Sequence, residues 1–219
     1  LDFIPNIKYG QFFYTIVVYN PDETACNYIK PVSIYIPKGE FRNIKVVQIS
    51  PSGRRSSVTT ISVKNSETQP ALTIKPTKNG LKYSYTNKLV QQTLELDTIK
   101  FTKSGIHQGV IEMKKYKSKE NLYMGLKFDG YIYIPETAQY EFSTIVDDGA
   151  KLFIDNQLIV DNDGRHWINE AFGAAKLEKG FHKINISYFD AAGSSVLQCF
   201  IRQEGKEKQE ISASQLYYK

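Results

Sequence analysis

The 219-residue chain contains few of the side chains on which nucleophilic catalysis and metal binding most often depend. It has two cysteines, Cys26 and Cys199, which lie far apart and lack the spacing of a metal site. The three histidines, His107, His166 and His182, show no H-x-x-x-H spacing. No Ser/His/Asp constellation accompanies them. The sequence therefore predicts a chain without catalytic activity of its own.

Long hydrophobic runs and strong charge are absent too. No apolar run approaches the roughly 18 residues that a membrane-spanning helix requires, so we expect no membrane span. The net charge of +5 is mild and the basic residues are scattered. The densest basic cluster, "KKYKSK" at 114–119, is typical of a solvated loop, so nucleic acid is not an expected partner. Because the chain begins at Leu1 without a signal peptide, we expect it to be a piece of a longer protein.

The residues that are abundant favour β-strands. The chain has 15 Tyr and 12 Phe, together with many Thr, Val and Ile residues, and these side chains suit a pleated, half-buried surface. Residues 11–63 hold short strand-like runs separated by turn signals such as Pro37-Lys38-Gly39, which predicts a small sandwich of the immunoglobulin or fibronectin type. We place this sandwich at 1–66, a linker and first strand entry at 67–79, and a larger all-β domain at 80–219.

Within the larger domain, residues 122–135 and 180–190 alternate between apolar and polar side chains. The second of these segments places His182, Ile184, Ile186 and Tyr188 on one face. Asp155-Asn156 fits the two central positions of a hairpin turn, where both residue types tolerate positive φ. Residues 169–180, "NEAFGAAKLEKG", could form a turn or two of helix, and no longer helix is predicted.

Aspartates concentrate between Tyr140 and Trp167. Asp147 and Asp148 are adjacent, and Asp161 and Asp163 follow in the next hairpin. Like charges this close repel one another, so a cation, a set of backbone donors or solvent must offset them.

The second group resembles an EF-hand loop, but the match fails at its first position. Counting from Ile159, residues Asp161, Asp163, Gly164 and Glu170 all occupy diagnostic positions. The loop needs a carboxylate where Ile159 stands, and it needs a flanking helix where an apolar strand is predicted. We therefore exclude an EF-hand.

Two interpretations remain open for Asp147 and Asp148. In an ordinary strand their side chains would point to opposite faces, but Gly149 eases a bend that could bring them together. They could then hold calcium with loop carbonyl oxygens, or they could accept hydrogen bonds from backbone N–H groups and shape a turn. A glycosidase acid/base pair does not suit them, because such carboxylates come from separate elements and face each other across the substrate.

An ordered set of motifs resembles the protective-antigen "PA-fourteen" domain, over about residues 71–219. The motifs are "YIYIP" after Gly130, "YEF", "DDGAKLFIDN", "VDNDGRH", "KGFH" and "YFD", with "GLKYSYTN" echoing the usual opening of the family. The resemblance implies a β-sandwich or barrel-like stack of strands, found in bacterial toxins, glycosidases and yeast adhesins. Carried over from the adhesins, it implies that Asp147 and Asp148 hold calcium that coordinates sugar hydroxyls, and that their peptide is cis. Asn162 and Asn169 are candidates for the asparagine that adhesins add.

The N-terminal part resembles the small sandwich at the C-terminal end of chitobiases and β-hexosaminidases. The resemblance rests on "YTIVVYNPDETACNYIKPVSIYI", with Pro21, Tyr28 and Pro31, and on "SPSGRRSS". Together the two parts resemble the noncatalytic C-terminal region of a bacterial glycoside hydrolase of family 20, a β-N-acetylhexosaminidase that is secreted, periplasmic or on the cell surface. The implied partners are the catalytic domain of that enzyme and a carbohydrate, either an N-acetylhexosamine-containing glycan or another polysaccharide. The alternative is a structural spacer or an adhesion module that contacts proteins and binds no sugar.

Three residues that follow Asp161 and Asp163 in the sequence are further candidates for ligand contact. Trp167 could stack on a sugar ring, although a sandwich of this size needs large core residues and we expect a buried structural role. Arg165 and His166 could donate to sugar hydroxyls, but we expect Arg165 to pair with Asp161 or Asp163 instead.

Overall fold

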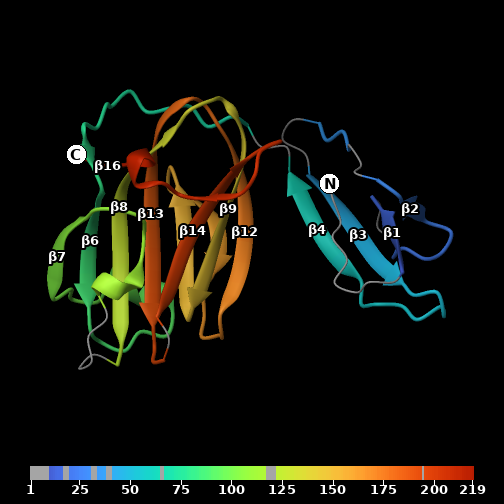
Figure 1. Ribbon diagram of the computed structural model, residues 1–219, viewed down its shortest axis with the longest axis horizontal. Helices are drawn as coiled ribbons and strands as arrows, with labels where there is room; N and C mark the ends of the chain where they lie inside the picture. The colour runs from blue at the N-terminus through green and yellow to red at the C-terminus, as the bar shows by residue number, and fades with distance from the viewer. Residues whose placement is uncertain are drawn as a thin grey trace. The chain divides into compact units, whose positions relative to one another are not determined.

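The computed structural model describes residues 10–16, 20–30, 34–37, 41–64, 67–116, 122–193 and 195–219. It divides into two compact units, Leu1–Glu67 and Thr68–Lys219. Antiparallel strands dominate both units, and the helical elements in the described residues are three short 3-10 helices (Figure 1). The predicted all-β class is therefore confirmed. No helix in the described part of the chain is long and apolar enough to cross a membrane.

The smaller unit contains one four-stranded sheet in the order β2-β1-β3-β4. Its strands are β1 (Gln11–Thr15), β2 (Cys26–Tyr28), β3 (Phe41–Ile49) and β4 (Thr59–Lys64). Phe13 and Tyr14 alternate into two separate apolar clusters, one with Val47 and one with Ile44. The predicted strand continuation at 17–19, Pro31 and the turn at Lys38-Gly39 lie outside the described residues.

The larger unit is a sandwich of two sheets. The first sheet runs in the order β11-β10-β13-β8-β16-β5, with β6 and β7 beside β8, and the second in the order β12-β9-β14-β15. The strands of the first sheet are β5 (Lys78–Asn79), β6 (Leu81–Thr86), β7 (Lys103–His107), β8 (Met124–Ile134), β10 (Gly149–Ile154), β11 (Gln157–Asn162), β13 (Gly180–Asp190) and β16 (Leu216–Tyr218). Those of the second are β9 (Ala138–Asp147), β12 (Asn169–Leu177), β14 (Val196–Gln203) and β15 (Gln209–Glu210). The 3-10 helices are η1 (Thr93–Asp97), η2 (Met113–Lys115) and η3 (Ala213–Gln215).

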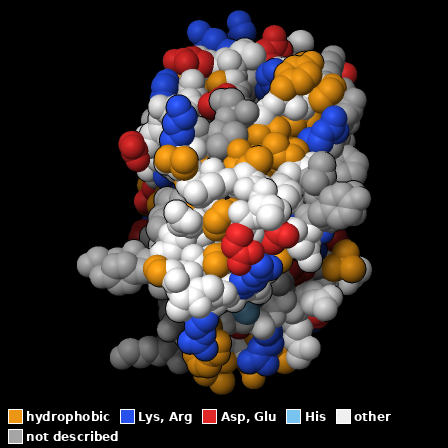
Figure 2. Space-filling model, turned by 90° about the vertical axis from the view of Figure 1, so that its right-hand side faces the viewer, with side chains coloured by type: hydrophobic (Ala, Val, Ile, Leu, Met, Phe, Trp, Pro, Cys, Tyr) orange, Lys and Arg blue, Asp and Glu red, His pale blue; other side chains and the backbone are white. Residues whose placement is uncertain are grey.

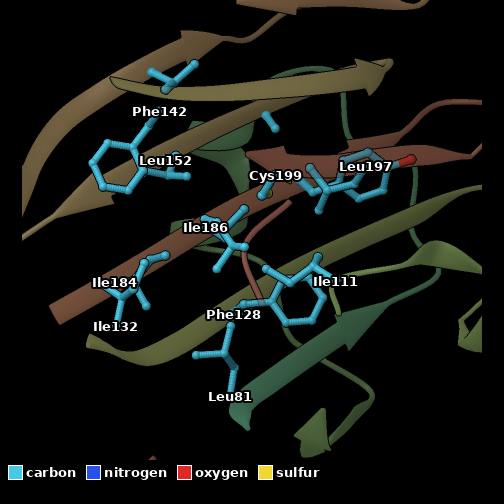
Figure 3. Close-up of a cluster of buried hydrophobic side chains, with 14 of the residues drawn as sticks. Leu81, Ile111, Phe128, Ile132, Phe142, Leu152, Ile184, Ile186, Leu197 and Cys199 are labelled. Atoms are coloured by element: carbon cyan, nitrogen blue, oxygen red, sulfur yellow. The ribbon is translucent and has the colours of Figure 1, made fainter. Parts of the chain in front are cut away.

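The inner faces of the two sheets form one hydrophobic core (Figure 3). Phe128 on β8, Phe142 on β9 and Leu152 on β10 are almost completely buried. The predicted face of β13 is confirmed, since His182, Ile184, Ile186 and Tyr188 are all buried. Each large apolar side chain removed from water in this way contributes about 1.5–3 kcal/mol of hydrophobic stabilisation, which holds the two sheets together.

The hairpin between β10 and β11 turns at the predicted residues. Asp155 and Asn156 have φ angles of 48° and 65°, the left-handed conformation that a two-residue hairpin turn requires. The helix suggested for 169–180 is wrong. Residues Asn169–Leu177 form β12, which pairs with β9 along its full length of nine residues. Pairing with a long neighbouring strand here outweighs the helical preference of the alanines, because strand formation depends strongly on context.

The chain that enters the larger unit is attached to its sheets from the start. Gln69 forms a parallel bridge with Leu177, and Leu72 forms an antiparallel bridge with Phe181. The backbone nitrogen of Ala71 also donates to Glu178 Oε2 at 2.9 Å. The segment 69–72 is thereby held against the ends of β12 and β13.

Charged side chains show no concentration of one sign on the face in Figure 2, where Lys and Arg are interspersed with Asp and Glu. In the "KKYKSK" cluster, Lys114 and Lys115 belong to η2, and Lys115 Nζ donates to the carbonyl of Gln108 at 2.6 Å. The last three residues of the cluster, 117–119, lie outside the described residues.

Candidate ligand-binding site

Asp147 and Asp148 lie at one end of the sandwich, where β9 leaves one sheet and β10 enters the other. The peptide bond between them is cis, as the family resemblance implied. Asp148 is buried, with 7% of its surface exposed, and Asp147 is half-buried. The two carboxylates therefore belong to an ordered junction between the sheets rather than to a solvated loop.

Residues at the end of β13 hold this junction in place. Asp148 Oδ2 accepts a hydrogen bond from the backbone nitrogen of Ala191 at 2.7 Å. The Tyr188 hydroxyl donates to the carbonyl oxygen of Asp147 at 2.8 Å. Burial, together with the negative charges of Asp190, Asp147 and Asp148, raises the pKa of Tyr188, so its hydroxyl stays protonated and remains a donor.

The loop that follows β13 is braced by its own aspartate. Asp190, 3% exposed, accepts a hydrogen bond from the backbone nitrogen of Ala192 at 2.9 Å and another from the Ser195 hydroxyl. Sequence reasoning missed this loop and its contact with Asp148. The signal available was "YFDAAG", an aspartate at a strand end followed by small residues, which is a common turn pattern.

The chemistry of the aspartate pair fits calcium, which takes six to eight oxygen ligands in flexible geometry. Asp148 Oδ1 makes no hydrogen bond with any described residue, and so keeps its capacity to act as a ligand. Among the described residues, no group of three or more His, Cys, Asp or Glu side chains is arranged to hold a metal ion. Asp147 and Asp148 would therefore hold the ion together with neutral oxygens from carbonyl groups, water or a ligand.

The other acidic residues have structural partners. Asp163 accepts hydrogen bonds from the Thr93 backbone nitrogen at 2.9 Å and from the Thr93 hydroxyl at 2.8 Å. Lys151 Nζ lies 3.2 Å from Asp163 and 3.7 Å from Asp161. The expected pairing with Arg165 is wrong. Arg165 is exposed and makes no ion pair with any described residue, whereas Lys151 on the neighbouring strand lies close to both carboxylates.

Asn162 and Asn169 close the base of the loop between β11 and β12 by contacting each other. Asn169 Nδ2 donates to Asn162 Oδ1 at 3.2 Å, and Asn162 Nδ2 donates to the carbonyl oxygens of Thr144 at 3.1 Å and of Asn169 at 3.2 Å. The ring nitrogens of His166 lie 2.7 Å from the carbonyl oxygen of Trp167 and 3.3 Å from that of Asn162. These contacts engage Asn162, His166 and the side-chain nitrogen of Asn169 within the loop and with β9.

Trp167 lies at the tip of this loop with 89% of its surface exposed. The expected buried role is therefore wrong, since the core is filled by residues of the two sheets and the loop extends beyond them. Ile168 and Phe172 are also exposed, at 61% and 55%. Trp167 and Ile168 on the loop and Phe172 on β12 thus offer apolar surface to solvent.

An all-β sandwich with a cis Asp-Asp peptide where one sheet passes into the other is the class of domain that the fold and this site define. The family model of the PA14 domain matches residues 77–214, and the chain belongs to this family. No protein of curated function matches the chain.

Solved structures share the fold at low sequence identity. An anti-sigma factor domain-containing protein from Clostridium clariflavum superposes with a TM-score of 0.54 at 19% identity, covering 64% of this chain and 47% of that one. The PA14 sugar-binding domain from an RTX adhesin gives a TM-score of 0.55 at 16% identity, covering 65% of this chain and 100% of that one. The A domain of epithelial adhesin 6 from Candida glabrata, solved in complex with Galβ1-3GlcNAc, gives 0.54 at 10% identity, covering 67% and 90%. The chain thus spans about half the length of the first of these proteins.

Proposed function

We propose that the larger unit is a noncatalytic carbohydrate-binding domain whose ligand docks at the end of the sandwich carrying Asp147 and Asp148. The observation that carries the proposal is the pair of adjacent carboxylates at an ordered junction of the two sheets, where Asp148 is buried and accepts a hydrogen bond from the backbone nitrogen of Ala191. The proposal is supported by two fold relatives: one is described as a sugar-binding PA14 domain, and the other was solved with a disaccharide.

Calcium is the cofactor we propose for this site. Bound to two carboxylates, it would supply open coordination positions for the neutral hydroxyl oxygens of a sugar. The protein's own contribution is to fix the two carboxylates: Ala191 holds one oxygen of Asp148, and Tyr188 holds the backbone of Asp147. Trp167, exposed on the loop after β11, would add an apolar face on which a sugar ring can stack.

We propose further that the chain is an accessory region of a secreted, periplasmic or cell-surface glycoside hydrolase, in particular a bacterial β-N-acetylhexosaminidase. The smaller unit would then contact the catalytic domain. Ile29 and Tyr35, each 86% exposed, offer apolar contact surface on that unit and support this role. The alternative, a spacer or protein-binding adhesion module, rests on the same two residues and predicts no sugar binding.

A thermal melt tests the metal part of the proposal. A ligand present at 100 times its dissociation constant stabilises the folded state by about 2.7 kcal/mol, so millimolar calcium should raise the melting temperature by several degrees relative to EGTA. Asp148→Asn should abolish the shift, whereas Asp161→Asn, which removes an exposed acid paired only loosely with Lys151, should keep it. No calcium shift in the wild type would overturn the calcium site.

A direct binding assay tests the sugar part. Galβ1-3GlcNAc and di-N-acetylchitobiose, titrated in calcium, should bind the wild type and the Asp161→Asn variant but not Asp148→Asn. A calcium-dependent rise in melting temperature, without binding to either probe or to a glycan array, would favour the hypothesis of a structural spacer.

A further inference from the structure

A hollow of about 320 Å³ lies on the larger unit, away from the aspartate pair. It is lined by residues of β8, β10 and β13 and by η1, which forms one wall. The three strands are neighbours in the order β10-β13-β8, so the floor of the hollow is the outer face of the eight-stranded sheet.

The register of the strands arranges the lining side chains in rows. Lys151, Ser187 and Lys127 stand opposite one another across the three strands. The next row is Phe153, Asn185 and Asp129. Because Ser187 is much shorter than the lysines beside it, the depression follows from the sequence of β13.

Each charged side chain that lines the hollow has a charged or polar partner. Lys127 pairs with Asp97, and Lys151 Nζ lies 3.2 Å from Asp163. Asn185 donates to Asp129. Lys183 Nζ donates a hydrogen bond to Asn156 Oδ1 at 3.1 Å. Three lysines and two aspartates line the hollow, and Asp163 beside Lys151 supplies a third negative charge. Groups of both signs therefore lie side by side, which disfavours an ionic ligand and suits hydroxyl groups, which both donate and accept.

Apolar surface accompanies these polar groups. The Phe153 ring is half-buried in the floor, and Leu94 on η1 is 69% exposed at the edge. A binding site that combines an aromatic face with a few convergent polar groups is suited to the amphipathic faces of a sugar ring.

The hollow is separate from the aspartate pair. The segment carrying η1 packs over the row of the sheet next to Asp148, where Leu96 clusters with Phe189 and Ala191. A Cβ on Gly125, which pairs with Phe189, would lie 2.7 Å from the Leu96 side chain, so η1 fits closely on this row. A ligand in the hollow would not depend on calcium at Asp148.

We propose that this hollow is a second carbohydrate-binding site, which takes a segment of an uncharged polysaccharide independently of calcium. The choice of a carbohydrate ligand rests on the proposed function, but the hollow contains neither Asp147, Asp148 nor Trp167. Two sites on one domain would increase retention on a polymer through multivalency.

Affinity gel electrophoresis of the full chain in EGTA tests the proposal, with galactomannan and hydroxyethylcellulose as uncharged probes and polygalacturonate as the charged one. At least one uncharged polymer should retard the wild type. Ser187→Tyr, which fills the hollow, and Phe153→Ala, which removes its aromatic floor, should each weaken retardation about tenfold. Ser104→Tyr, the same change on an exposed position of β7, should behave as wild type. Melts of each variant confirm folding, and Phe153→Ala decides the result if Ser187→Tyr does not fold.

Three outcomes would overturn the second site. One is no retardation by either uncharged polymer in EGTA. Another is retardation that both Ser187→Tyr and Phe153→Ala retain. The third is retardation by polygalacturonate alone that disappears in about 0.5 M NaCl, where exposed charges are screened. Binding that needs calcium and is lost in Asp148→Asn would support the aspartate site while rejecting the hollow, so the two proposals fail separately.

Discussion

Asp163 accepts hydrogen bonds from both the backbone nitrogen and the hydroxyl of Thr93, a residue 70 positions earlier in the chain. Through this contact the loop after β11 anchors η1, whose Leu96 packs on Phe189. Burial opposes the charged form of Asp163, but the bonds from Thr93, Gly164 and Lys151 outweigh it and hold the pKa of the carboxyl below its usual value.

Replacing Asp163 with Ala should lower the free energy of unfolding by about 2–3 kcal/mol, because hydrogen bonds to a charged group are lost and the Thr93 donors are left unpaired. Thr93→Val removes the hydroxyl alone and should cost about 1 kcal/mol. Urea unfolding at pH 7 measures the free energy of unfolding of both variants. Asp161→Ala is the matched control and should remain close to wild type, since exposed ion pairs contribute little. Equal effects at Asp161 and Asp163 would contradict the anchoring role.

The sign of the pH dependence follows from the depressed pKa. The stabilisation from Asp163 is fully present above the unfolded-state pKa of 3.8 and is lost as the pH falls through the lower folded-state value. Unfolding measured at decreasing pH should therefore show a smaller acid-induced loss of stability in Asp163→Ala than in the wild type.

His182 has a raised pKa, so its contribution to stability depends on pH with the opposite sign. Its buried ring lies 2.6 Å from Asp155 Oδ2 and 2.8 Å from the carbonyl oxygen of Glu178. Burial disfavours the imidazolium, but the bonds to Asp155 and Glu178 outweigh it and raise the pKa of His182 above 6.5. The stabilisation is complete below 6.5 and is lost as the pH rises through the folded-state value.

Asp155→Asn tests this pair with little change to the turn, because Asn tolerates the positive φ and can still accept from the backbone nitrogen of Lys183. An NMR titration should show the pKa of His182 falling in the variant, together with a weaker decline of stability between about pH 6.5 and 8. His107, whose pKa is lowered mainly by burial, is the internal control and should not change. A His182 titration that is unaltered by the substitution would show that Asp155 does not set its charge.

Much of the fold could be predicted from the sequence because it depends on local patterns. Alternation located β8 and β13, and Asp155-Asn156 marked the hairpin, since side-chain period and turn conformation are properties of neighbouring residues. The family motif located the cis peptide. The partner of Asp163 and the exposure of Trp167 could not be predicted in this way, because they depend on which distant segments meet at the end of the sandwich. The strand at Asn169–Leu177 was missed for the same reason, since its pairing with β9 outweighs its local preference.

Gly173 on β12 lies where a strand of the second sheet comes close to β11 of the first. A Cβ at this position would lie 1.6 Å from the carbonyl oxygen of Ile159 on β11. Gly173→Ala should therefore destabilise the protein by about 3 kcal/mol or more, since a backbone oxygen cannot move aside as a side chain can. Gly105→Ala is the control. Its Cβ would meet the Tyr83 ring at 3.0 Å, a side chain that can shift, so a cost below about 1 kcal/mol is expected from thermal or urea unfolding.

Trp167 is the only tryptophan in the chain, so intrinsic fluorescence reports on the loop after β11. With 89% of its surface exposed, the indole should be quenched by acrylamide nearly as efficiently as N-acetyltryptophanamide. Trp167→Ala should change the free energy of unfolding by less than about 0.5 kcal/mol, whereas truncating a buried aromatic such as Phe142 should cost about 3–5 kcal/mol.

Trp167 also allows a test of whether the loop after β11 contacts a ligand or has only a structural role. If the loop contacts carbohydrate at the aspartate pair, titration with a bound glycan in calcium should shift the emission and protect the indole from acrylamide. Trp167→Ala should then weaken glycan binding while leaving the calcium-dependent rise in melting temperature intact, because the ion is held by Asp147 and Asp148. Loss of both effects on Trp167→Ala would mean that the loop maintains the metal site. Protection without any loss of affinity would place the indole near the ligand but outside the contacts that hold it.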